Sequence, residues 1–264
     1  MTGIWAKALR VMTSLASPII IVHSLPAFGG AGLGVILPVL GTQAIPVPSI
    51  YLNATPDYPE SQRWPNAQLI EQLQANLKFQ NHAGRKPDLF IGYLASVQQA
   101  EGIVNWLSEQ RENLGKIWVD PICGDHGRAY VSKDLISVWL KILNFADVAL
   151  PNSTEIELLA DAEGLNRIQW LSTQVLRATI LETSAEPQGG SRGVCIHHKA
   201  ATEMINLPWE PRSYRGTGDL FAACLIKEEA ALRSWSTRVQ SAAKTVSETI
   251  RYSAKKDAEC LLLP

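Results

Sequence analysis

The chain has 264 residues, of which 46% are hydrophobic, with 24 Lys and Arg against 25 Asp and Glu. This length can bury a full core, and we expect residues 1–264 to form one domain. The balanced charge gives no support for nucleic-acid binding, which needs clustered positive side chains. The four cysteines are widely spaced and form no CxxC pair, so we expect reduced thiols and a cytoplasmic protein.

The first candidate element is an apolar strand at 19–22. The apolar run 11–22, which follows Lys7 and Arg10, superficially resembles a secretory signal. Polar residues and Pro18 interrupt this run, no A-x-A cleavage pattern follows, and the run is too short to span a bilayer. We therefore predict a buried parallel strand and no membrane partner.

Further along the chain, short apolar runs alternate with longer segments of helical period. The other predicted strands are 44–47, 88–91, 116–120, 147–150, 178–182 and 193–197, and the predicted helices are 32–42, 66–80, 97–111, 133–144 and 154–160. A C-terminal amphipathic helix follows from the stripe Val239, Ala243, Val246 and Ile250. This order predicts an α/β fold with a mostly parallel sheet and helices on both faces. We expect irregular structure at 51–65 and 184–192.

The segment Arg215-Gly216-Thr217-Gly218-Asp219 stands before the apolar run 220–226. Glycines that open a helix leave its first N–H groups unpaired and let the backbone approach an anion. Asp219 could accept a proton from an attacking hydroxyl while these amides hold the charge of a transferred phosphoryl group. Aspartate is also a favoured helix N-cap, and this motif alone leaves both interpretations open.

Two carboxylates follow the apolar residues 117–119 of the predicted strand. Asp120 and Asp125 are five residues apart and could hold a hydrated Mg²⁺ that bridges nucleotide phosphates. Alternatively, these aspartates could make local turns with the backbone. His126 is better explained as a surface histidine of the same loop.

Two later segments also stand at expected strand ends, where open parallel sheets bind ligands. Asn152 and Glu155 have the spacing of a capping box, and the same pair could instead reach phosphate and metal. Thr183 and Ser184 have hydroxyls suited to a phosphate contact, although hydroxyls are common in turns.

Together and in this order, these segments resemble the pyridoxal and pyridoxamine (vitamin B6) kinases of the ribokinase-like superfamily. The resemblance runs from about residue 20 to about residue 254. It is carried by SLPAFGGAGLG (24–34), GYLAS (92–96), VDPICGDHGRAYV (119–131), PNSTEIELL (151–159) and RGTGDLFAA (215–223). GDHG with a nearby tyrosine, combined with GTGD, distinguishes this group from the hydroxymethylpyrimidine phosphate kinases.

The resemblance implies a three-layer α/β sandwich that transfers the γ-phosphoryl group of ATP to the 5′-hydroxymethyl group of a B6 vitamer. Asp219 would be the catalytic base, and the amides of Gly216, Thr217 and Gly218 would form the anion hole. The other implied roles are Mg²⁺ binding by Asp120, Asp125 and Glu155, ATP binding by Asn152, Glu155, Thr183, Ser184, Asp125 and Tyr130, and substrate binding by Ser24, Tyr93 and Asp219. A homodimer is also implied.

The chain departs from the family pattern at two places. The family's His, Thr and Gly after the second strand are here Thr55, Pro56 and Asp57, and the Thr associated with a monovalent cation is here Leu150. We therefore expect intact phosphate chemistry with altered recognition of the pyridine ring. The alternatives are a kinase for another small alcohol, such as hydroxymethylpyrimidine, and a nucleotide-binding homologue with low turnover.

Overall fold

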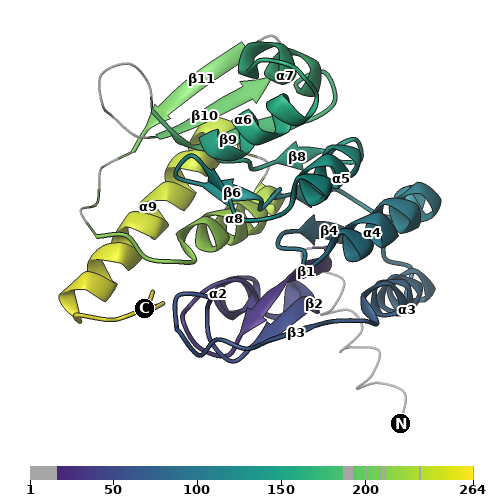
Figure 1. Cartoon of the computed structure of the whole chain (residues 1–264), viewed down its shortest axis with the longest axis horizontal. Coiled ribbons are helices and arrows are strands. Elements are labelled where there is room, and N and C mark those ends of the chain that lie inside the picture. The colour runs from purple at the N-terminus through teal and green to yellow at the C-terminus, as the bar shows by residue number, and fades with distance from the viewer. Residues whose placement is uncertain are drawn as a thin grey trace.

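The computed structural model describes residues 17–186, 193–199, 201–207, 210, 212–231 and 233–263. A nine-stranded sheet has the order β11-β10-β9-β8-β5-β4-β1-β2-β3 (Figure 1). Its strands are β1 (Ile19–Pro26), β2 (Ala44–Leu52), β3 (Arg63–Pro65), β4 (Asp88–Ile91), β5 (Ile117–Val119), β8 (Val148–Ala149), β9 (Thr179–Ala185), β10 (Gly193–His198) and β11 (Ala201–Asn206). The central pairs from β2 to β9 are parallel, and antiparallel pairs lie at both edges.

Helices cover both faces of this sheet, as the sequence predicts. They are α2 (Leu33–Leu40), α3 (Leu69–His82), α4 (Val97–Gln110), α5 (Lys133–Leu143), α6 (Ser153–Ala162), α7 (Arg167–Gln174), α8 (Thr217–Lys227) and α9 (Trp235–Lys255). In Figure 1, α2, α8 and α9 lie on one side of the central strands, and α3, α4 and α5 lie on the other. The predicted three-layer α/β architecture is therefore confirmed.

The first strand shows why both faces need helices. Ile20 and Val22 belong to the core under α3 to α7, whereas Ile19 and Ile21 belong to the core under α2, α8 and α9. Successive side chains of a strand point to opposite faces, so a strand that is apolar throughout must be buried on both. The continuous run at 19–22 has this property.

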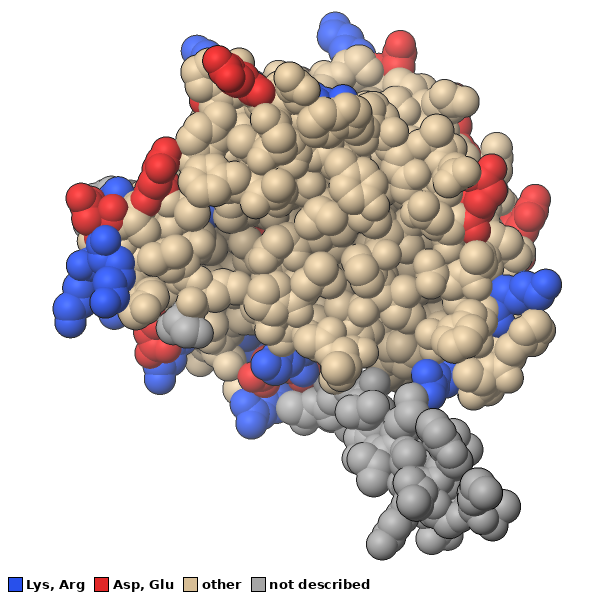
Figure 2. Space-filling model, turned by 90° about the horizontal axis from the view of Figure 1, so that it is seen from below, with Lys and Arg blue, Asp and Glu red and all other residues tan. Residues whose placement is uncertain are grey.

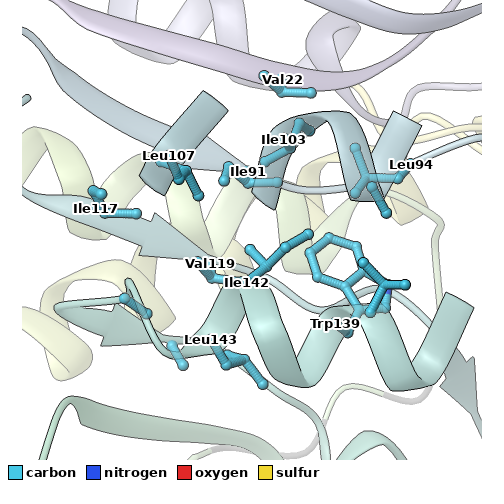
Figure 3. Packing of buried hydrophobic residues seen from close by; sticks show 14 of the residues in the cluster. Val22, Ile91, Leu94, Ile103, Leu107, Ile117, Val119, Trp139, Ile142 and Leu143 are labelled. Atoms are coloured by element: carbon cyan, nitrogen blue, oxygen red, sulfur yellow. The ribbon is translucent and has the colours of Figure 1, made fainter. Parts of the chain in front are cut away.

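Side chains of neighbouring strands meet the helices in layers. Figure 3 shows Val22, Ile91 and Val119 of three adjacent strands in the same cluster as Ile103 of α4 and Trp139 of α5. All five side chains are almost completely buried. This packing fixes the strand ends, and with them the loops that follow.

Several elements differ from their predicted extent. The segment 51–65 is not wholly irregular, because β2 continues to Leu52 and Arg63–Pro65 pairs with β2 as an edge strand. At 184–192, Ser184 and Ala185 still belong to β9, and 187–192 lie outside the described residues. Three further features were not predicted from the sequence: α7, β11 and the hairpin of β6 (Gly124–Asp125) and β7 (Arg128–Ala129).

Two further predictions concern the first strand and the C-terminal helix. The predicted strand at 19–22 is confirmed within β1, whereas positions 1–16 of the signal-like segment lie outside the described residues. In α9, Val239 and Ala243 are buried, and Val246 and Ile250 pack partly buried against the same core. Within the described part of the chain, no helix is both long and apolar enough to cross a membrane.

The face shown in Figure 2 carries charged side chains mainly around its rim and uncharged side chains across its middle. Lysine or arginine and aspartate or glutamate both occur on this rim.

Candidate active site

A cavity of about 1000 Å³ lies beyond the carboxyl ends of the central parallel strands. All but one of the predicted site residues line it, from six separate segments of the chain. They are Ser24, Tyr93, Asp120, Asp125, Tyr130, Asn152, Glu155, Thr183, Gly216, Thr217, Gly218 and Asp219. Ser184 lines a neighbouring cavity of about 760 Å³ that also touches Asp125, Asn152 and Thr217.

The N-terminus of α8 forms part of the cavity wall. Gly216 precedes the helix with a φ of 82°, and a Cβ at this position would collide with the carbonyl oxygen of Gly30. The Gly32 amide at the N-terminus of α2 donates to Asp219 Oδ2 at 2.6 Å. Two glycine-rich loops that are far apart in sequence therefore meet at the start of α8, whose first amides have no hydrogen-bond acceptor among the described residues.

Asp219 is buried in the first turn of α8, and both of its carboxylate oxygens have close neighbours. His23 Nε2 of β1 lies 3.1 Å from Oδ1, and the Gly32 amide occupies Oδ2. Burial opposes ionisation of this carboxyl, but His23 and Gly32 outweigh it, so the pKa of Asp219 lies below its ordinary value. Asp219 is thus an ionised acceptor in a protected cavity.

Asp120 and Glu155 form a second acidic group of the cavity. Glu155 is buried and accepts the amides of Cys123 and Asn152, the latter within a complete capping box. The Asp120 carboxylate has no hydrogen-bond partner among the described residues. Burial and the charge of Asp219 raise the pKa of Asp120 to about 7, and burial and the charge of Asp120 raise the pKa of Glu155.

These carboxylates fit a divalent cation. Mutual repulsion of buried carboxylates is relieved when a cation lies between them, and oxygen ligands suit Mg²⁺. Asp120 has a free carboxylate for such a contact, whereas both oxygens of Glu155 already accept backbone N–H groups.

The β6–β7 hairpin lies beside this acidic group. His126 and Gly127 form its turn with φ of 50° and 73°, and the Gly127 amide donates to Thr154 Oγ1 of α6 at 2.9 Å. Asp125 and Tyr130 flank the turn and are exposed. The Asp125 carboxylate accepts the amide of His126, so it makes the local turn contact that the sequence left as an alternative.

Asn152, Thr183 and Ser184 belong to adjacent strand ends, and Asn152 and Thr183 are joined by a parallel β-bridge. Asn152 caps α6 by accepting the Glu155 amide, and its NH₂ group donates to the Gly124 carbonyl. Ser184 has a φ of 54°, and its carbonyl accepts Ser153 Oγ. Capping is therefore a structural role of Asn152 whatever else it contacts.

The neighbouring cavity contains a charged network that was not predicted from the sequence. Glu182 contacts Arg167, His197 and Ser153, and its carboxylate is almost fully buried. Burial opposes ionisation, but these three partners lower the pKa of Glu182 to about 2. Burial likewise lowers the pKa of His197, but Cys195 and Glu182 outweigh it and raise the pKa to about 9.

Three potential metal-ligand atoms also lie within 4.8 Å of one another here, from Glu182, Cys195 and His197. However, Arg167 already pairs with Glu182, and a protonated imidazole cannot ligate a metal. The ion-pair network is the sufficient explanation for this cluster.

Comparison with known proteins assigns the family. Residues 42–261 match the family model described as phosphomethylpyrimidine kinase. The chain belongs to this family. A pyridoxine/pyridoxal/pyridoxamine kinase of Bordetella avium is 26% identical over 269 residues, which cover 93% of this chain and 88% of the relative. The match agrees with the resemblance to vitamin B6 kinases.

Solved structures match this family member over most of its length. Pyridoxal kinase from Lactobacillus plantarum has a TM-score of 0.78 at 24% identity and covers 93% of this chain and 91% of its own. Pyridoxal kinase from Leishmania donovani in complex with ADP and pyridoxamine has a TM-score of 0.74 at 21% identity, covering 91% and 88%. The fold of this phosphomethylpyrimidine kinase family member is therefore that of the pyridoxal kinases.

The two departures from the pyridoxal kinase pattern lie at the cavity of this family member. Thr55 is buried and leaves no room for a side chain at Gly29, and Thr55 and Pro56 line the cavity. Asp57 pairs with Arg215, next to the start of α8. Leu150 also lines the cavity and is packed among apolar side chains, so it offers no hydroxyl to a monovalent cation.

Proposed function

We propose that the chain is an ATP-dependent kinase that phosphorylates the 5′-hydroxymethyl group of a B6 vitamer. The observation that carries the proposal is the ionised, buried Asp219 carboxylate in the first turn of α8, beside the glycine amides that precede it. A base next to a cluster of unpaired backbone donors suits transfer of a phosphoryl group to a hydroxyl.

In this mechanism the substrate hydroxyl lies against Asp219, which accepts its proton as the oxygen attacks the γ-phosphorus. The bond from that phosphorus to the bridging oxygen breaks, and ADP leaves. The amides of Gly216, Thr217 and Gly218 hold the charge that develops on the transferred group. Asp120 would hold Mg²⁺ directly, with Asp125 and Glu155 acting on it through water, and the ion would neutralise phosphate charge when bound.

The nucleotide is proposed to extend from α8 into the neighbouring cavity. Thr217 lines both cavities, and Ser184 lines the second one beside Asn152. With Thr183 and Tyr130 they offer hydroxyl and amide groups to phosphates. The ADP complex of the Leishmania donovani enzyme, which has the same fold, supports a nucleotide here.

A second candidate substrate is a hydroxymethylpyrimidine, because the matched family is described as phosphomethylpyrimidine kinase. Ser24 and Tyr93 line the cavity in either case, and Thr55 and Pro56 replace the ring-binding residues of the pyridoxal kinases. A missing hydrogen bond to a ring costs about 0.5–1.5 kcal/mol. We therefore propose weaker binding of pyridoxal than is usual for that group.

A cytoplasmic homodimer with a single domain remains part of the proposal. The edge strand β3 pairs with β2, and Tyr51 and Trp64 of this pair are 45% and 51% exposed. Large apolar side chains on an exposed edge are suited to contact with a second copy of the chain.

The substrate is tested by assaying ATP consumption with pyridoxal, pyridoxamine, pyridoxine and hydroxymethylpyrimidine side by side. The proposal predicts the highest kcat/KM with one of the three B6 vitamers. A clear preference for hydroxymethylpyrimidine would show that the proposed substrate is wrong and that the proposed kinase activity is correct. Nucleotide binding without phosphorylation of any of the four alcohols would contradict the proposed activity.

A further inference from the structure

We propose that His23 is a positioning residue that holds the Asp219 carboxylate in its reactive orientation through its Nε2–H. The proposal rests on the proposed role of Asp219 as the base. His23 has no role in the predictions from sequence.

The direction of the His23 side chain follows from the strand. Ile19 and Ile21 point to the face covered by α2, α8 and α9, and the two-residue period of a strand places His23 on the same face. The start of α8 lies there, so the imidazole approaches Asp219 although the two residues are far apart in sequence.

Hydrogen bonds to the other ring nitrogen fix the tautomer. The amide of Ser24 donates to His23 Nδ1 at 2.9 Å, and Ser24 Oγ lies 3.2 Å from the same nitrogen. A nitrogen that accepts an N–H carries no proton of its own, so Nδ1 is the acceptor and the N–H of the ring is on Nε2. This is the nitrogen that lies 3.1 Å from Asp219 Oδ1.

The Nε2 atom is fully buried and has no well-aligned hydrogen-bond partner among the described residues. The contact with Asp219 is therefore short but not collinear with the N–H. Catalytic hydrogen bonds are often poorly aligned before ligands bind and tighten in the complex. A buried donor left without another acceptor strongly favours completing this bond.

The surrounding packing keeps the ring in place. His23 is 2% exposed, and a Cβ at Gly92 would collide with its Cδ2 and Nε2 atoms. A Cβ at Gly32 would lie 3.0 Å from Nδ1. Glycines on two loops thus leave the space that the imidazole fills, and the ring has little room to turn away from Asp219.

Two donors from different elements then hold one carboxylate. His23 of β1 contacts Oδ1 and the Gly32 amide of α2 contacts Oδ2, while Asp120 is the other charged group that faces Asp219. Without His23, the carboxylate gains rotational freedom and loses a donor that favours its ionised form.

The kinetic test compares His23→Leu with His23→Gln, because a glutamine amide N–H can take the place of Nε2–H and leucine offers no donor. Displacing a reacting group by about 1 Å can cost about 100-fold, so we expect kcat to fall about 10- to 100-fold in the leucine variant. We expect KM for ATP and for the alcohol to stay within about twofold. The acid limb of its kcat profile should move to higher pH. The glutamine variant should recover most of kcat and keep the wild-type profile.

Wild-type kcat and an unchanged pH profile in a folded leucine variant would overturn the proposal. A loss confined to KM for the alcohol would also overturn it, since His23 would then be a substrate contact. Thermal unfolding establishes that each variant is folded. Should the leucine variant not fold, His23→Asn takes its place, because its shorter amide keeps the Ser24 contact and cannot reach Asp219. Equal activity of the asparagine and glutamine variants would contradict the proposal.

A second measurement needs no turnover. Imidazole ¹⁵N chemical shifts of the wild-type protein at neutral pH should show His23 with a protonated Nε2 and a bare Nδ1. A protonated Nδ1 would contradict the proposal whatever the protein phosphorylates. An inactive wild-type protein with the expected tautomer would instead place the failure in the proposed function.

Discussion

Asp120 and Glu155 lie at the same cavity, but their carboxylates have different surroundings. Both oxygens of Glu155 accept backbone N–H groups that hold the start of α6 and the loop after β5. Asp120 has no such partner among the described residues, and burial with the nearby Asp219 charge raises its pKa. Of the two side chains, Asp120 is the one free to act on a cation.

This difference predicts distinct effects of two conservative variants. Asp120→Asn should weaken MgATP about tenfold and leave ATP without metal nearly unchanged, because the lost charge acts through the cation. Glu155→Gln should instead lower the unfolding temperature, because the amide NH₂ cannot accept a backbone donor. Calorimetry with and without Mg²⁺ measures the first effect. Equal weakening of both nucleotide forms would mean that Asp120 contacts the nucleotide directly or serves the fold.

An ionic network joins α7, β9 and β10 through Arg167, Glu182 and His197. The pKa of His197 is raised from 6.5 to about 9, so its stabilising effect is complete below pH 6.5 and is lost as pH rises through 9. The pKa of Glu182 is lowered from 4.5 to about 2, so its effect is complete above pH 4.5 and is lost as pH falls through 2.

We therefore predict that wild-type stability falls by about 1–3 kcal/mol as pH rises from the unfolded-state to the folded-state pKa of His197, because a tenfold change in proton affinity corresponds to about 1.4 kcal/mol. His197→Gln should flatten this decline and should be most destabilising below pH 6.5. Denaturant unfolding at a series of pH values measures both. A constant difference between variant and wild type across that range would show that the imidazole charge does not stabilise the fold.

The loop before α8 gives a second prediction for an element. The Gly216→Ala substitution adds a Cβ at a residue with positive φ, which costs about 1–2 kcal/mol for an L-residue. The added Cβ also collides with the Gly30 carbonyl oxygen. We expect kcat to fall about 10- to 100-fold, because the displaced amides no longer meet the transferred phosphoryl group.

Gly164→Ala is the matched control for this variant. Gly164 lies after α6, has a φ of 70° and has open space where a Cβ would be. An alanine substitution there causes the same backbone strain as at Gly216 without the collision. The control should lose about 1 kcal/mol of stability and keep full activity. Equal kcat in the two variants would show that the Gly216 loop does not shape the catalytic site.

For the whole molecule, the central sheet could be predicted because each inner strand is an apolar run flanked by segments of helical period. The elements that were not predicted do not show this alternation of apolar runs and helical segments. β11 is mostly exposed, and β6 and β7 have two residues each. For α7 a signal was available, since Asn166 and Gln169 form a capping box at its start.

The candidate site was predictable to the extent that each residue follows a strand or opens a helix. The contacts between segments could not be predicted, because no local sequence pattern shows that β1 lies beside the start of α8. Gly32 and Asp219 are 187 residues apart, and His23 meets Asp219 only in the folded chain. Ionisation of Asp219 depends on both contacts, so its state could not be derived from the motif alone.

The central claim is that Asp219 removes the proton from the hydroxyl that attacks ATP. The most direct measurement is kcat for pyridoxal phosphorylation in wild type and Asp219→Asn, with ATP affinity determined by calorimetry on the same preparations. Loss of a general base typically costs about 10²- to 10⁴-fold, so kcat should fall within that range. ATP affinity should change by no more than about threefold, because the amides at the start of α8 remain. A variant that retains more than about half of wild-type kcat would contradict the claim.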